Sequence, residues 1–234
     1  MATVEWSGVR ERINALREIA NAAQDFDARF GHYQLRPPLS ATELADVHHQ
    51  LGIELPVDYQ EFLTRVGAGG AGPHYGVFPL VNVDGQWRWE GDGANLTDLA
   101  HLAEPFPLRA SNWRAIESLD ALRPDPNSFV RADAYREAEQ IWDEQYNALV
   151  WDPRLTHGAI CISHEGCALR RWLVVSGPEQ GNMWIDHRAD GRALTPDWLP
   201  GLDRVTFGQW YLSWLHATTV TLERRTETEK LQPT

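Results

Sequence analysis

The first part of the chain carries apolar residues at helical spacing. Between residues 4 and 30 they recur at three- and four-residue steps, while arginine and glutamate fall between them. The apolar positions are Trp6, Val9, Ile13, Leu16, Ala20, Ala23, Phe26 and Phe30. This pattern predicts one long amphipathic helix that ends at Gly31.

Two shorter helices are predicted next. Ser40 and Glu43 form an S-x-x-E capping box ahead of a run with helical periodicity, and Gly52 follows as a stop signal. A further helix is expected to begin near Pro56, because proline suits the first helical turn, and to end at Gly67. The chain is therefore predicted to open with three helices.

The pattern then changes to short alternating runs. Residues 77–81 and 86–90 alternate apolar and polar side chains, which predicts two strands. In the second run Trp87 and Trp89 are two residues apart, so both are expected on one face of the strand.

The middle of the chain is expected to be an insertion or lid. Residues 92–128 contain several prolines and show no clear periodicity, so we expect them to be irregular. Residues 129–150 return to a helical pattern. A helical insertion is therefore predicted near residues 129–150.

Three alternating runs follow, over residues 158–163, 168–175 and 182–187, separated by glycine-containing turns. They predict an antiparallel meander. Thr206 and Gln209 then form a T-x-x-Q capping box for a closing helix.

The predicted fold class is α+β, with N-terminal helices packed against a mixed or antiparallel sheet and a C-terminal helix. We expect one domain over residues 1–222. The polar tail, residues 223–234, is expected to be frayed.

Composition and charge narrow the classes of function. With 33 acidic and 21 basic residues, the formal net charge is −12, which argues against nucleic acid or an anionic membrane as partner. The same charge also serves solubility, so it does not by itself establish recognition of a basic partner. The two cysteines make no disulfide framework, and the apolar runs are too short to span a membrane. A cytoplasmic protein is expected.

No catalytic or cofactor motif is found in a suitable context. The GAGGAG run, Gly67 to Gly72, follows a predicted helix and precedes Pro73, so it is interpreted as a turn rather than a dinucleotide site. Cys161, His164 and Cys167 lack a fourth zinc ligand, and His164 is interpreted as a turn residue. Pairs among Asp152, Glu165 and Asp186 are expected by chance in so acidic a chain. No metal, no cofactor and no enzymatic activity are expected.

Two segments combine glycine turns with apolar runs in a recognisable order. The first is LGIELPVDYQEFLTRVGAGGAGPHYGVFPL, Leu51 to Leu80, in which a helix ends in Leu-Gly before an L-P step, Phe-Leu and a glycine-rich turn. The second is GAICISHEGCALRRWLVVSGPEQGNMWIDHRADG, followed by TFGQWYLSWL. The first segment resembles the signature of the SUKH superfamily, and the second is similar to the closing strands and helix of that superfamily. The superfamily includes yeast regulators of cell-wall glucan assembly and bacterial immunity proteins.

The resemblance implies an α+β fold and a protein-binding role, as in an immunity protein that neutralises a basic toxin domain. The alternatives are a regulatory or scaffold protein of cell-wall or signalling type, and an enzyme that uses carboxylates. We expect a monomer whose partner-binding residues lie at turns and strands beside the two segments. They are Asp58, Tyr75, Trp87, Trp89, Glu165, Glu179, Trp184 and Asp186.

Overall fold

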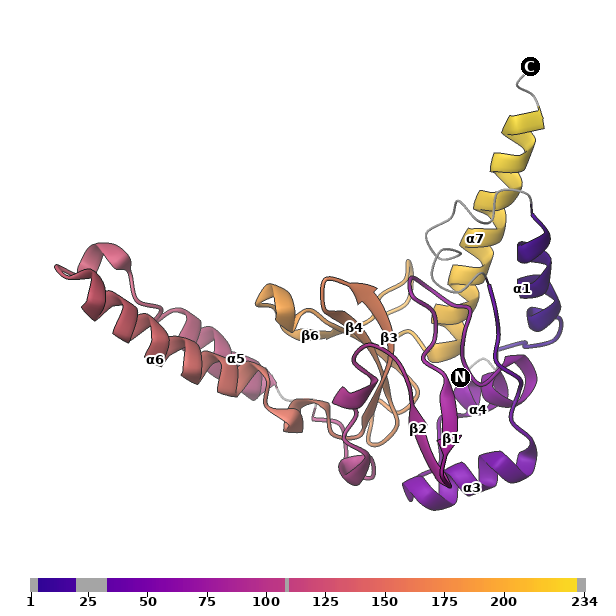
Figure 1. The fold of residues 1–234 in the computed structure, drawn as a ribbon, viewed down its shortest axis with the longest axis horizontal. Coiled ribbons are helices and arrows are strands. Elements are labelled where there is room, and N and C mark those ends of the chain that lie inside the picture. Colours follow the sequence, from indigo (N-terminus) through magenta and orange to yellow (C-terminus); the bar gives the residue numbers. More distant parts are fainter. Residues whose placement is uncertain (1–3, 20–32, 108–109, 231–234) are drawn as a thin grey trace. The chain divides into compact units, whose positions relative to one another are not determined.

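Figure 1 shows the fold as a computed structural model, which describes residues 4–19, 33–107 and 110–230. The chain divides into two compact units. The first combines Met1–Phe106 with His157–Thr234, and the second is Pro107–Thr156. No helix within the described ranges is long and apolar enough to cross a membrane. Helices and antiparallel strands together make an α+β fold, as predicted.

Helices open the first unit. They are α1 (Val9–Glu18), α3 (Ala41–Leu51) and α4 (Val57–Glu61), which continues as the π-helical turn η2 (Phe62–Val66). The predicted capping box of α3 is confirmed, because Ser40 Oγ accepts from the Glu43 N–H at 3.2 Å and the Glu43 carboxylate accepts from the Ser40 N–H at 2.7 Å. Gly52 ends α3 with a left-handed φ of 66°.

The first helix is shorter than predicted. Gly8, in a left-handed conformation with φ 69°, precedes the helix, so α1 begins at Val9 rather than near residue 4. The backbone is extended at Ile19, which ends the helix there. The rest of the predicted helix, residues 20–30, lies outside the described residues, as does its predicted stop at Gly31.

The first sheet is a hairpin of β1 (Leu80–Val83) and β2 (Gln86–Trp89), which pair antiparallel. Asp84 and Gly85 both have positive φ, 53° and 81°, as a two-residue hairpin turn requires. Trp87 and Trp89 both point to the buried face, which confirms the alternation predicted from the sequence. β1 begins three residues later than predicted because Val77 pairs with Gly70 and the Phe78 N–H donates to Ile162.

The second sheet confirms the predicted meander. Its strands are β3 (Ala159–Gly166), β4 (Leu169–Val174), β5 (Met183–Asp186) and β6 (Leu194–Pro196), in that order and all antiparallel. Cys167 and Ala168 have positive φ, 49° and 61°, and turn the chain from β3 into β4. The sequence did not predict β6, which has only three residues and too short a pattern to detect. Short 3-10 turns complete the first unit: η3 (Ala94–Leu96), η4 (Leu99–His101) and η7 (Arg188–Asp190).

The closing helix α7 (Phe207–Lys230) runs beside α1 (Figure 1). Its predicted cap is confirmed: the Gln209 N–H donates to Thr206 Oγ1 and the Gln209 side chain accepts from the Thr206 N–H. The prediction that the chain frays from Glu223 is wrong as far as Lys230. Leu222 is fully buried, so the apolar face of the helix extends to the beginning of the polar stretch.

An aromatic cluster joins these helices in the core. Trp6, Tyr59, Phe62, Phe207 and Tyr211 are all buried. The Phe62 and Tyr211 ring centroids are 4.8 Å apart, as are those of Tyr59 and Phe207, the latter pair edge to face. Such pairs contribute about 0.5–1.5 kcal/mol each beyond the burial of their area. The cluster holds the start of α7 against α4 and η2.

The second unit consists of α5 (Ala110–Asp120), η5 (Pro126–Ser128), α6 (Ala132–Val150) and η6 (Pro153–Thr156). α6 confirms the helix predicted over residues 129–150. The prediction that residues 92–128 are irregular is wrong at α5, which packs on α6 through a 2.8 Å hydrogen bond from Trp142 Nε1–H to the Leu119 carbonyl. The flanking prolines had obscured its short periodicity.

Candidate functional site

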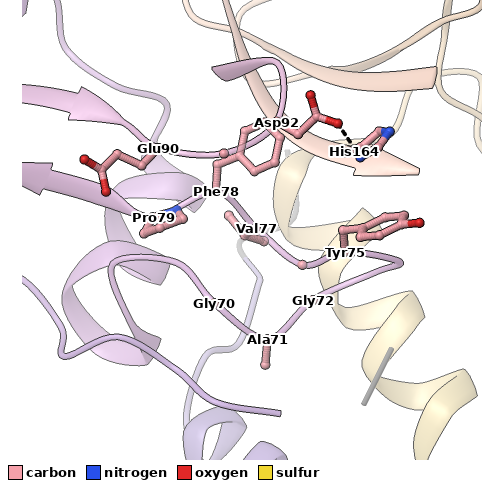
Figure 2. A pocket seen from close by; sticks show the side chains of 12 residues that line it. Gly70, Ala71, Gly72, Tyr75, Val77, Phe78, Pro79, Glu90, Asp92 and His164 are labelled. Carbon is pink, nitrogen blue, oxygen red and sulfur yellow. Dashed lines mark ion pairs between the residues drawn. The ribbon is translucent and has the colours of Figure 1, made fainter. Parts of the chain in front are cut away.

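A pocket of about 290 Å³ opens in the first unit beside the glycine-rich loop (Figure 2). Three segments far apart in the sequence form it: the loop between η2 and β1, the residues after β2, and the middle of β3. Its lining includes Gly70, Ala71, Tyr75, Phe78, Glu90, Asp92 and His164. The pocket therefore combines an apolar wall with a few titratable side chains at its edge.

The backbone of the loop explains the GAGGAG run. Gly69 and Gly70 have φ of 114° and 107°, and a Cβ on Gly70 would overlap the carbonyl oxygen of Gln34. The N–H groups of Gly70, Ala71 and Val77 donate to the carbonyls of Val77, Gln34 and Gly70 at 2.7–2.8 Å. These donors are therefore not free to hold a phosphate, and the interpretation of the run as a helix-to-strand turn is confirmed.

Tyr75 and His164 form one side of the pocket. Their rings stack with centroids 4.7 Å apart and planes 19° apart. His164 Nδ1 lies 3.3 Å from Asp92, whose other oxygen is 3.2 Å from Arg170 Nη2, and Figure 2 shows the first of these ion pairs. Burial and the Arg170 charge lower the pKa of His164, although Asp92 and Glu165 oppose them. The ring of His164 thus supplies a flat surface for Tyr75.

A line of ion pairs continues from this side of the pocket across the sheet. His74 Nε2 lies 3.6 Å from Glu165, which also contacts Arg171, and Arg171 Nη1 lies 2.8 Å from Asp197. Burial raises the pKa of Asp197, against the effect of the Arg171 charge. Trp198, the next residue, is 67% exposed. We call the pocket together with this line and Trp198 the loop surface.

The structure buries the three tryptophans predicted as partner contacts. Trp87 Nε1–H donates to Asp46 at 2.7 Å, and Trp89 Nε1–H donates to the hydroxyl of Tyr59 at 2.8 Å. Trp184 packs edge to face on Phe106, with centroids 4.9 Å apart. Each tryptophan is at most 9% exposed, so its observed role is in packing. A role in partner binding stays a prediction.

The predicted acidic residues also have partners within the fold. Asp186 is 2% exposed and forms a 2.6 Å ion pair with Arg188. Glu179 accepts from Arg204 at 2.7 Å, and Asp58 accepts from Thr206 Oγ1 at 2.7 Å. Arginines therefore neutralise much of the acidic face predicted on the meander.

Of the predicted contacts, Tyr75 lines the pocket and Glu165 lies in the line of ion pairs that leads from it. The sequence analysis did not select Glu90 or Asp92, and it interpreted His164 as a turn residue. No local signal links these positions, because β3 meets the end of β2 only through the tertiary fold. The spacing of Cys161 and Cys167 is no guide either, since Cys161 is buried and Cys167 is exposed at a turn.

The pocket offers few groups for chemistry. Its described lining residues include no serine, threonine or cysteine that could act as a nucleophile beside His164. The thiol of Cys161 lies in the core, where burial raises its pKa to about 12. What the geometry does provide is an apolar recess with aromatic and charged groups around it.

Comparison with known proteins gives a match to a family model. A family model described as the SMI1 / KNR4 family (SUKH-1) matches residues 38–198, more than half of the chain. The matched region runs from just before α3 to just after β6 and contains every residue named above as lining the pocket. Neither a curated protein nor a solved structure gives a match.

Proposed function

Because the chain belongs to the SMI1 / KNR4 family (SUKH-1), we propose that it is a non-enzymatic protein-binding domain that neutralises a toxin domain. The observation that carries the proposal is the loop surface, in which a recess, exposed carboxylates and an exposed tryptophan lie along connected elements. It acts as the docking surface for the toxin, in the cytoplasm, and requires no catalytic group.

The recess and Trp198 supply the apolar part of this surface. Interfaces draw most of their affinity from a few aromatic and apolar anchors that enter pockets on the partner. Trp198 is such an anchor, because two-thirds of its area is exposed while its backbone N–H donates to Asp197 at 2.7 Å. In the other direction, the pocket beside Tyr75 accepts one side chain of the partner.

The charged part favours a basic partner. The side chain of Asp92 is 71% exposed although it touches His164 and Arg170, and Glu90 lies on the same pocket edge. With a net charge of −12, these carboxylates attract a basic surface and accelerate encounter. Association is therefore expected to slow steeply as salt is added.

A charge-matched pair of variants tests the proposal. Glu90→Arg with Asp92→Asn raises the net charge by three, and asparagine keeps an oxygen for Arg170. Glu11→Arg with Glu18→Gln makes the same charge change on exposed positions of α1. We expect the pocket variant to slow association with the toxin about tenfold or more at low salt, and the α1 variant to slow it far less.

The partner for this test is the product of the gene beside that of this chain, identified by native pull-down and mass spectrometry. Growth of cells that express this partner, with and without the present chain, reports protection. Equal effects of the two variants would show that net charge alone determines the rate of association. Capture of several housekeeping proteins without toxicity would favour the regulatory alternative, and turnover abolished by single carboxylate substitutions would favour an enzyme.

A further inference from the structure

A second group of titratable side chains lies in the first unit, outside the residues that line the pocket. Asp98 precedes η4 and accepts from the Ala100 N–H, and His101 is the last residue of that turn. His157 comes from a distant part of the chain, just before β3. The Gly158 N–H donates to the His101 carbonyl at 3.1 Å, which fixes the two segments side by side.

Three side chains converge here. Asp98 Oδ2 lies 2.6 Å from His101 Nδ1 and 3.5 Å from His157 Nε2. One ligand atom from each of the three residues lies within 4.8 Å of the others. Zinc bonds of about 2.0–2.2 Å in tetrahedral geometry place ligand atoms roughly 3.3–3.6 Å apart. The pair of Asp98 and His157 already has this spacing, and that of Asp98 and His101 has to open by about 1 Å.

Glu104 orients one of the histidines. Its Oε2 lies 2.9 Å from His157 Nδ1. A proton on Nδ1 donated to this carboxylate leaves the lone pair on Nε2, the atom that faces Asp98. Metal-binding histidines commonly have such a carboxylate on the second ring nitrogen. The side chain of His157 is only 11% exposed, so this orientation is held by packing as well.

The histidine rings define the movement that binding requires. They stack with centroids 4.3 Å apart and planes 2° apart, so their in-plane lone pairs cannot meet at one ion. Glu104 lies 2.9 Å from His157 but 3.9 Å from His101, and the side chain of His101 is 42% exposed, so His101 is the ring that can turn out of the stack. Turning only His101 brings its nitrogen toward an ion beside Asp98.

We propose that Asp98, His101 and His157 bind a divalent transition-metal ion of the zinc type, with Glu104 orienting His157 and water in the fourth position. Mixed imidazole and carboxylate ligands suit zinc better than calcium or magnesium, which prefer oxygen alone. The site goes beyond the proposed function and differs from the expectation of no metal. Asp98 and His101 form a D-x-x-H pair in sequence, but His157 is brought to them only by the fold.

Zinc titration of chelator-stripped protein, followed by calorimetry, tests the site. We expect one equivalent to bind, with affinity reduced about tenfold or more by His101→Gln or His157→Gln and about tenfold by Glu104→Gln. His49→Gln and His216→Gln remove exposed histidines outside the cluster and should change the affinity less than about twofold. His101→Gln alters an exposed side chain, so this variant is expected to fold even if His157→Gln does not.

Cobalt binding provides a spectroscopic readout that would not change if His101 had only a structural role. Co²⁺ bound to nitrogen and oxygen ligands in a four-coordinate site has visible d–d absorption, which should be present in the wild type and lost in His101→Gln. Zinc uptake that is absent in the wild type would overturn the proposal. Uptake reduced no more by His101→Gln than by His49→Gln would overturn it equally, since it would indicate adventitious binding to surface histidines.

Discussion

Replacing Asp186 with alanine is expected to destabilise the first unit severely. Asp186 accepts from the Arg188 backbone N–H at 3.0 Å, from Arg188 Nε at 2.9 Å and from Arg188 Nη2 at 2.6 Å. It also accepts from Trp172 Nε1–H at 3.1 Å. The side chains of both ion-pair partners are at most 5% exposed. Removing the carboxylate leaves a buried guanidinium without this counter-charge, which costs about 3–5 kcal/mol.

The assay is urea unfolding followed by tryptophan fluorescence, with circular dichroism to confirm the fold. Asp190→Ala is the matched control, because its partner Arg192 is 3.5 Å away and both side chains are well exposed. Such a pair contributes about 0–1 kcal/mol. Replacing Asp186 and Arg188 together by leucine should recover part of the loss, since no buried cation then remains. A cost below about 1 kcal/mol for Asp186→Ala would refute this reasoning.

Three further variants probe the loop, the core and the pocket. Gly70→Ala should lower the melting temperature more than Gly201→Ala, because both glycines have positive φ but only Gly70 also faces a backbone oxygen. Equal shifts in melting temperature would contradict the overlap between a Cβ at position 70 and that oxygen. Trp89→Phe should lower the free energy of unfolding by about 1–3 kcal/mol beyond the lost packing, because it leaves the buried Tyr59 hydroxyl without its donor. Adding Tyr59→Phe to this variant should lower the free energy little further, as measured by urea unfolding. His164 has a pKa below its ordinary 6.5, so its stabilising effect is present above pH 6.5 and is lost as pH falls through the lower folded-state pKa. Wild type should therefore lose more stability than His164→Asn on acidification, and parallel pH profiles would argue against it.

Much of the fold is predictable from sequence because local signals determine it. The capping boxes at Ser40 and Thr206 mark the starts of α3 and α7, and alternation with glycine turns marks β3, β4 and β5. These signals depend only on residues that are close together in the sequence. Where such a signal is short or obscured, as in α5 between its flanking prolines, the prediction is wrong.

The site is far less predictable, because it depends on which residues the fold buries. Asp186 and Trp184 have the residue types of an exposed recognition face, yet the sheet turns both inward and gives Asp186 an arginine two residues away. Asp92 and His164 come together across 72 positions. The same reason hides the group of Asp98, His101 and His157, whose third member is supplied by a distant segment.

The most direct test of the central claim is site-specific photo-crosslinking from the loop surface in living cells. A photoreactive phenylalanine analogue replaces Tyr75 at the pocket or, as control, His216 on the exposed side of α7. The account predicts that one polypeptide is captured from position 75 and not from position 216, and that its expression alone arrests growth unless this chain is present. Capture of that polypeptide from position 216 alone, or a captured partner that is harmless without this chain, would contradict it.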